Sequence, residues 1–283
     1  MNIGDSEITH ETKPNKECYC EQLAHTMIGF ICSGEKRIYE KEHCTVVSEG
    51  QVFILRSGVY FIEDIPTAST FKQTIFRISA KDIYRNMERL AIDNQISIPE
   101  FMHRDLATKS IYITTPNVYL NLIFSKMECI NNHTGHNYIL DNILRHHIDM
   151  LIATIVLDIH SSLRKPLLSG IDIDKNIFQS ILFSSILKPD CTLDELARKT
   201  HNSRTAFKLK FAKIYSTTPH KWIVEHRLNI SIPLLLATNN QVSEIAIKCG
   251  FIDTSHYIRL FKLHFKTTPR AYRSSKRKQI AKL

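Results

Sequence analysis

The sequence lacks the features that mark most enzymes, secreted proteins and membrane proteins. Its seven cysteines are an odd number without a regular framework, which predicts reduced thiols. The longest apolar run, MLIATIVL, is far too short to span a bilayer, and the polar stretch MNIGDSEITHE has no apolar signal region. There is no glycine-rich phosphate loop and no nucleophile elbow. We therefore expect a cytoplasmic protein that is not an enzyme, needs no cofactor and does not enter a membrane.

The histidines do not form a metal-binding pattern, although there are fourteen of them. No pair has the His-x-His spacing that would aim two imidazoles inward from one strand. His146 and His147 are adjacent, so on a helix they point to different sides, and His133 and His136 flank a glycine in a predicted loop. The sequence therefore predicts no metal site.

What the chain does contain is an internal repeat near its C-terminus. The segment LDELARKTHNSRTAFKLKFAKIYSTTPHKW is followed by VSEIAIKCGFIDTSHYIRLFKLHFKTTPRAY. Glu195 recurs 49 positions later as Glu244, and Phe207 recurs 50 positions later as Tyr257. Two copies are too few for a solenoid, so the repeat predicts one supersecondary unit that is used twice.

Each copy is predicted to be a helix, a tight turn and a second helix. Apolar residues recur at i, i+3 and i+4 on both sides of a short polar break. Thr192 and Ser203 can cap the two helices of the first copy. In the second copy Gly250 stands where a helix end favours a left-handed residue, and Asp253 can cap the helix that follows. A helix-turn-helix of this kind can place its second helix in the major groove of DNA.

The residues opposite the apolar stripe of each second helix are the candidates for DNA contact. At 100° per residue they are Thr205, Lys208, Leu209 and Ala212 in the first copy, and Ser255, Ile258, Arg259 and Lys262 in the second. Arg259 is the strongest candidate for base reading, because its guanidinium can bond both major-groove acceptors of guanine. Leu209 holds the matching place in the first copy and offers only apolar contact, for instance to a thymine methyl.

Positive charge is concentrated in the same segment. Residues 192–283 contain 18 Lys and Arg against 5 Asp and Glu, which is +13, whereas the whole chain carries +9. The rest of the chain is therefore slightly negative. A basic segment of this kind is what phosphate binding requires, and the tail residues Arg270, Arg273, Lys276, Arg277 and Lys278 are expected to add to it.

The second copy resembles the signature of the AraC/XylS family of bacterial transcription regulators. The matching stretch is IAIKCGFIDTSHYIRLFKLHFKTTPRAYR, with its Gly-Phe turn, its Phe-Lys helix end and its Thr-Pro-x-x-Tyr-Arg close. The resemblance covers about the last hundred residues. It implies two helix-turn-helix subdomains joined by one long helix, from about His220 to Ala237. It also implies that the protein binds double-stranded promoter DNA and works with RNA polymerase. Together with the helical-face argument, it gives as DNA-contacting residues Arg204, Thr205, Lys208, Leu209, Thr254, Ser255, Ile258, Arg259 and Lys262.

One residue departs from the family pattern. Pro233 lies inside the joining helix, where it removes a backbone donor and crowds the carbonyl of Asn229. A kink or a break is therefore expected there.

The N-terminal half is predicted to be a small antiparallel barrel followed by helices, so that the fold class is α+β. Up to about residue 80, short runs of Val, Ile, Phe and Tyr at period two alternate with Gly and Ser turns, as in HTMIGFI and QVFILRSGVYFIEDI. This pattern is similar to the cupin-like sensing barrel that the family often has. Helices are expected over about 81–92, 117–130 and 138–160.

The predicted division of the chain is a regulatory and dimerisation domain over 1–165, a linker over 166–173 and the DNA-binding domain over 174–283. The apolar stripe Leu144, Ile148, Leu151, Ile155 and Ile159 is more typical of a core than of an interface. The family resemblance nevertheless implies a possible homodimer through these helices, and control by a small molecule or a partner protein.

The cysteines near the N-terminus raise a second class of function. Cys18 and Cys20, with Cys32 and Cys44 further on, could belong to a zinc-supported DNA alkyl-transfer repair protein fused to the same DNA-binding domain. The paired Cys-x-x-Cys spacings of such a site are absent, so the sequence favours a transcription regulator, an activator by the habit of the family.

Overall fold

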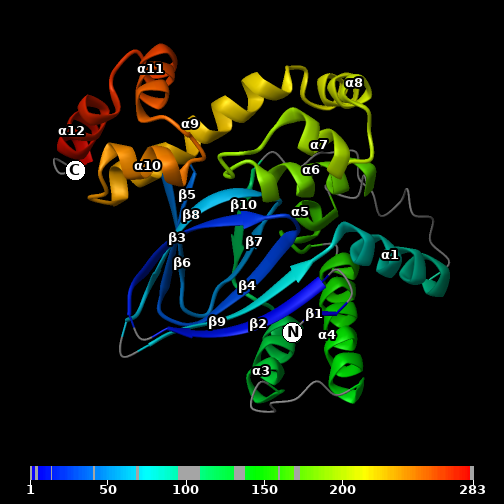
Figure 1. Ribbon diagram of the computed structural model, residues 1–283. Helices are drawn as coiled ribbons and strands as arrows, with labels where there is room; N and C mark the ends of the chain where they lie inside the picture. The colour runs from blue at the N-terminus through cyan, green and yellow to red at the C-terminus, as the bar shows by residue number, and fades with distance from the viewer. Residues whose placement is uncertain are drawn as a thin grey trace.

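The computed structural model describes residues 2–3, 6–13, 15–40, 42–67, 70–94, 109–130, 138–158, 160–168 and 173–280. The strands lie in the N-terminal part together with several helices, and the C-terminal part is helical (Figure 1). The fold class predicted from the sequence, a cupin-like antiparallel barrel followed by helices and then an all-helical domain, is confirmed.

The barrel is built from two antiparallel sheets. Among the described residues, one sheet has the strand order β1-β2-β9-β4-β7-β10, and the other has the order β3-β8-β5-β6. The strands are β1 (Asn2–Ile3), β2 (Ser6–Lys13), β3 (Glu17–Leu23), β4 (Thr26–Ser33), β5 (Glu35–Glu40), β6 (His43–Ser48), β7 (Val52–Leu55), β8 (Gly58–Ile65), β9 (Phe71–Ile78) and β10 (Ile111–Thr114). The alternation in the sequence did not predict β1, β2, β3 and β10.

Alternation along β8 places neighbouring residues in different cores. Successive side chains of a strand point to opposite faces of the sheet. Tyr60 and Ile62 therefore lie in the core between the two sheets. Phe61 points out of the barrel and is buried in a core of the C-terminal domain. The four-stranded sheet thus supports the barrel with one face and the C-terminal domain with the other.

Helices cover the outer face of the six-stranded sheet. They are α1 (Ala80–Asn94), α3 (Val118–Ile130), α4 (Tyr138–Leu157) and α5 (Arg164–Leu168). Leu144, Ile148, Leu151 and Ile155 on α4 are buried in one core with side chains of the sheet, as expected for a core stripe. Ile159, the last residue of the predicted stripe, lies outside the described residues.

The linker prediction needs a correction. Residues 166–168 belong to α5, and Pro166, Leu167 and Leu168 are buried. Proline is tolerated there because it stands in the first turn of the helix, where its missing N–H costs nothing. The N-terminal domain therefore extends to Leu168, and the rest of the predicted linker, residues 169–172, lies outside the described residues.

The C-terminal domain is entirely helical in its described part. Its helices are α6 (Ile173–Ser185), α7 (Leu193–Lys199), α8 (Arg204–Tyr215), α9 (Pro219–Ala237), α10 (Val242–Lys248), α11 (Thr254–Phe265) and α12 (Pro269–Ile280). In Figure 1, α9 runs over the end of the barrel, and α8 and α11 lie on the side away from the strands. No helix among the described residues is long and apolar enough to cross a membrane.

Candidate nucleic-acid interface

The first helix-turn-helix consists of α7 and α8. Thr192 Oγ1 accepts a hydrogen bond from Glu195 N at 3.1 Å, and Ser203 Oγ accepts one from Ala206 N at 3.2 Å, so both predicted caps are confirmed. Phe207 and Phe211 are fully buried on one face of α8. We call this core, which also contains side chains of α6, α7 and α9, the first subdomain core.

The opposite face of α8 is open to solvent. Arg204, Thr205, Lys208 and Leu209 are all exposed, Leu209 by 69%. A leucine with this exposure does not contribute to the core, and its position is available for apolar contact with a base. Arg204 Nε lies 3.6 Å from Asp194 Oδ1 on α7, at the surface.

The second helix-turn-helix consists of α10 and α11, and its turn has the geometry that the sequence predicts. Gly250 adopts a φ of +84°, which side chains with a Cβ rarely tolerate. Asp253 accepts hydrogen bonds from Ser255 N and His256 N, both at 3.0 Å, and so caps α11. At the start of α10 the cap is Gln241, which forms a capping box with Glu244.

The face of α11 opposite Tyr257 and Phe261 carries the predicted base-reading residues. Ser255, Arg259 and Lys262 are exposed. Thr254 and Ile258 are only half-exposed, and Ile258 packs against the core that contains Tyr257 and Phe261, which we call the second subdomain core. Ser255, Arg259 and Lys262 are therefore accessible to DNA, whereas Ile258 contacts the core and is only partly accessible. These assignments remain predictions of contact.

The joining helix α9 is continuous across Pro233. Thr218 caps its start by accepting a hydrogen bond from Lys221 N, and Pro219 occupies the first turn. Helical geometry runs unbroken to Ala237, so the expected break is absent. Pro233 is buried among apolar neighbours of α9.

Two arginines of the predicted phosphate-binding tail have a different role. Arg273 donates to Leu235 O at 3.0 Å and to Asn240 O at 2.6 Å. Arg277 donates to Leu236 O at 2.9 Å and also to Thr238 O. The last carbonyls of a helix have no partner within it, and cations stabilise that end. Both guanidinium groups therefore hold α12 against the C-terminal end of α9.

The other tail residues divide between contact and solvent. Lys276 Nζ lies 2.9 Å from Glu42 Oε2 of the N-terminal domain. Arg270 is exposed, and the side chain of Lys278 lies outside the described residues. The interpretation of the tail as a phosphate-binding run is therefore wrong for Arg273 and Arg277.

The cysteines give no support to the repair alternative. Cys18 Sγ lies 3.5 Å from Glu63 Oε1, and burial raises the pKa of both Cys18 and Cys44. Burial also raises the pKa of Cys20 to about 11, whereas a nucleophilic thiol needs a lowered pKa. In the described part of the chain, no three His, Cys, Asp or Glu side chains are grouped so that they could hold a metal ion.

Comparison with known proteins agrees with this geometry. A family model described as a helix-turn-helix domain matches residues 196–275. The transcriptional regulator ArgR of Pseudomonas aeruginosa is 27% identical over 97 residues, which are 34% of this chain and 30% of ArgR. The transcriptional activator NphR of a Rhodococcus species is 31% identical over 124 residues, which are 44% of this chain and 33% of NphR. The chain thus spans about a third of the length of these curated relatives.

One solved structure aligns with most of this chain. The structure of ToxT from Vibrio cholerae covers 95% of this chain and 97% of its own, at 15% identity and a TM-score of 0.46. The family model covers both caps of the second unit, the Gly250 turn and both exposed helix faces. The C-terminal part of this chain is a DNA-binding domain of the AraC/XylS family of transcription regulators.

Proposed function

We propose that the chain is a sequence-specific transcription regulator, an activator, that is controlled through its N-terminal domain and works with RNA polymerase in the cytoplasm. The observation that carries the proposal is the pair of solvent-exposed faces on α8 and α11, each opposite a fully buried pair of aromatic residues. The +13 charge of residues 192–283 supplies affinity for phosphates of any sequence. The exposed faces of α8 and α11 make the base contacts that distinguish one sequence from another.

Two recognition helices in one chain define the shape of the expected binding site. If they enter successive major grooves on one side of the duplex, their centres lie about 34 Å apart. One chain would then contact two short base clusters separated by about one helical turn. A homodimer would contact two such pairs.

In vitro selection from a random duplex library tests the proposal. We expect the full chain to enrich a site with two base clusters about 10 bp apart. A duplicated site would support the homodimer, for which α4 offers exposed Ile143, Met150 and Leu157 at seven-residue intervals. Enrichment of no sequence over the starting library would contradict the proposal.

The N-terminal domain contacts both helix-turn-helix subdomains, which supports control through it. Val59 of β8 packs against both subdomain cores, and Phe61 is buried in the second. Beyond β5, Glu42 accepts hydrogen bonds from Tyr272 and Lys276 of α12. Lys276 and Tyr272 hold the pKa of Glu42 below its usual value, because both donors stabilise its carboxylate.

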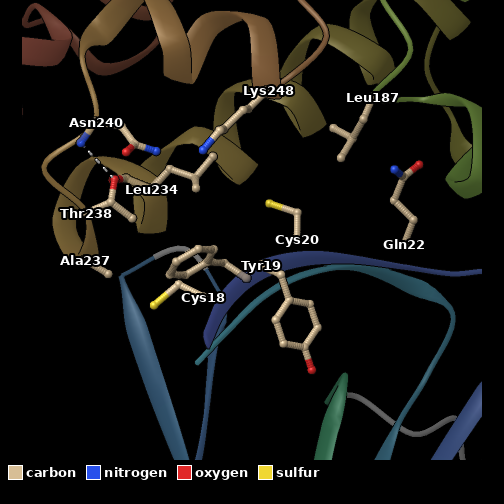
Figure 2. A pocket seen from close by; sticks show the side chains of 11 residues that line it. Cys18, Tyr19, Cys20, Gln22, Leu187, Leu234, Ala237, Thr238, Asn240 and Lys248 are labelled. Carbon is tan, nitrogen blue, oxygen red and sulfur yellow. Dashed lines mark hydrogen bonds between the residues drawn. The ribbon is translucent and has the colours of Figure 1, made fainter. Parts of the chain in front are cut away.

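A cavity of about 670 Å³ between the domains is the proposed effector site (Figure 2). The N-terminal domain contributes Cys18, Tyr19, Cys20, Gln22 and Phe61 to its lining. The C-terminal domain contributes Leu187, Leu234, Ala237, Thr238, Asn240 and Lys248. Lys248 is the charged side chain of this lining. The cavity therefore suits a small molecule with an apolar body and an anionic group, which would bind between the two domains and change how they contact each other.

Filling the cavity tests this assignment. Decanoate is expected to raise the unfolding temperature of the wild-type chain, because a ligand that binds only the folded state stabilises it by about 2.7 kcal/mol at 100 times its Kd. Ala237→Trp should remove that shift by occupying the cavity, whereas Ile92→Trp, on the exposed side of α1, should retain it. Equal shifts in both variants would place the ligand elsewhere, and no shift in the wild type would reject this ligand class.

A further inference from the structure

Arg227 of α9 contacts the first subdomain through its main chain. Its Nε donates to Ile186 O at 2.7 Å, and its Nη2 donates to Lys188 O at 2.8 Å. Both acceptors lie just after α6, in the segment that leads to the Thr192 cap of α7. The planar guanidinium makes these two bonds from a fixed fork, so it sets the distance and the angle between α9 and that segment.

The same guanidinium contacts the turn of the second helix-turn-helix. Its Cζ lies 5.9 Å from the centre of the Phe251 ring. A Cβ added to Gly250 would lie 2.9 Å from Arg227 Nε and 2.8 Å from Leu187 O. The turn between α10 and α11 is therefore in direct contact with Arg227 and with the segment that Arg227 bonds. This close approach is a second reason, besides its positive φ, for glycine at position 250.

One side chain thus joins the three parts whose arrangement decides how the two recognition helices lie. On one side is the segment that leads to α7, and on the other is the turn that contains Gly250 and leads to Asp253, the cap of α11. The third part is α9 itself, in which Pro233 removes a main-chain hydrogen bond six residues further on. The contacts of Arg227 on both sides therefore add to the orientation that the continuous helix α9 sets.

We propose that Arg227 is a positioning residue that fixes the spacing between the two base clusters bound by one chain. It does this without touching DNA, by holding the two helix-turn-helix subdomains in one relative orientation. The inference rests on the proposed function, since it requires that both recognition helices read the same duplex. Loss of the guanidinium should leave each reading face intact, because the aromatic pairs behind α8 and α11, Phe207 with Phe211 and Tyr257 with Phe261, stay fully buried in their own cores.

Selection of binding sites by Arg227→Lys and Arg227→Gln tests the proposal. Lysine keeps the charge but cannot bond two carbonyls from one planar fork. Both variants should select the same bases in each cluster as the wild type does, but with a broader or shifted distribution of spacings. On the site that the wild type selects, their affinity should fall about 2- to 30-fold, the range for residues that couple two sites without touching either ligand.

Arg277→Gln is the matched control. It also removes an arginine that bonds main-chain carbonyls of the same domain, but its acceptors lie at the end of α9 and in the loop after it, within the second subdomain. It should lower the unfolding temperature and leave the selected spacing unchanged. All variants are compared at a temperature where circular dichroism shows them folded.

The outcomes separate the inference from the proposed function. If the wild type itself selects no sequence, the proposed function fails. If the wild type selects a two-cluster site and both Arg227 variants keep its spacing, or lose affinity equally for every spacing, Arg227 is not a positioning residue. If Arg277→Gln changes the spacing as much as the Arg227 variants do, general loosening of the domain is responsible and the inference is wrong.

Discussion

Replacing Asp64 with alanine is expected to destabilise the N-terminal barrel by about 3–5 kcal/mol, the usual cost of removing one partner of a buried ion pair. Asp64 and Lys36 are both completely buried, and Lys36 Nζ lies 2.5 Å from Asp64 Oδ1. Lys13 Nζ lies 2.7 Å from Asp64 Oδ2, and Tyr19 donates to the same oxygen at 3.0 Å. Without the carboxylate, the Lys36 ammonium would keep the Tyr19 hydroxyl at 3.2 Å, nearby aromatic rings and the weaker attraction of Glu11.

The loss should depend on pH in a direction that identifies its cause. Burial already lowers the pKa of Lys36 against the opposing effect of Asp64, and removal of Asp64 should lower it further. Over the range between that lowered pKa and the ordinary value of 10.5, the unfolded chain then binds more protons than the folded one. The free energy of unfolding therefore rises with pH. The free energy of unfolding of Asp64→Ala should fall furthest below that of the wild type near pH 7. Near pH 9 this difference should be smaller.

Denaturation by urea, followed by circular dichroism, measures this loss. The single tryptophan, Trp222, lies in the first subdomain core, so its fluorescence reports the C-terminal domain separately. The double variant Lys36→Met with Asp64→Leu removes both charges and should regain most of the stability that the single variant loses. A single variant that is as stable as the wild type at pH 7, or a deficit that does not change with pH, would show that the buried ammonium is not the source of the cost.

The sequence predicted those features of the domain that depend on neighbours along the chain. The caps at Ser203 and Asp253 and the left-handed Gly250 could be found because each acts on main-chain groups within a few residues. The two exposed recognition faces follow from helical periodicity in the same way. That a fully buried aromatic pair lies behind each of them confirms the period of the pattern.

The features that were missed depend on partners far along the chain. Arg273 and Arg277 have the appearance of a phosphate-binding run, but their acceptors lie 33 to 41 positions earlier. The carboxylate that pairs with Lys36 is 28 positions away, on a neighbouring strand. Glu42 is separated by 230 positions from its partner on α12. No local pattern signals such contacts. The sequence around a charged residue looks the same whether its side chain faces solvent, DNA or the end of another helix.

The two recognition helices are chemically unequal, and Arg259→Ala is expected to reveal the difference. Arg259 is exposed on α11, with Ser255 and Lys262 one turn to either side on the same face. A guanidinium that bonds the two major-groove acceptors of guanine contributes about 1–3 kcal/mol of discrimination, so its loss should weaken binding to the selected site about 5- to 150-fold. Binding to random duplexes should change much less. Competition assays with both duplexes at fixed salt measure the two effects.

Leu209→Ala is the matched variant, since Leu209 holds the corresponding position on α8. Leu209→Ala removes only apolar contact. It should therefore weaken the base preference at one position of the cluster bound by α8, by a smaller factor than Arg259→Ala weakens the preference for guanine. Arg259→Lys should recover part of the affinity but little of the preference for guanine, because an ammonium does not bond both acceptors from a planar fork. Equal weakening of Arg259→Ala on selected and random duplexes would assign Arg259 to a phosphate, and the choice of sequence would then have to come from other residues of α8 and α11.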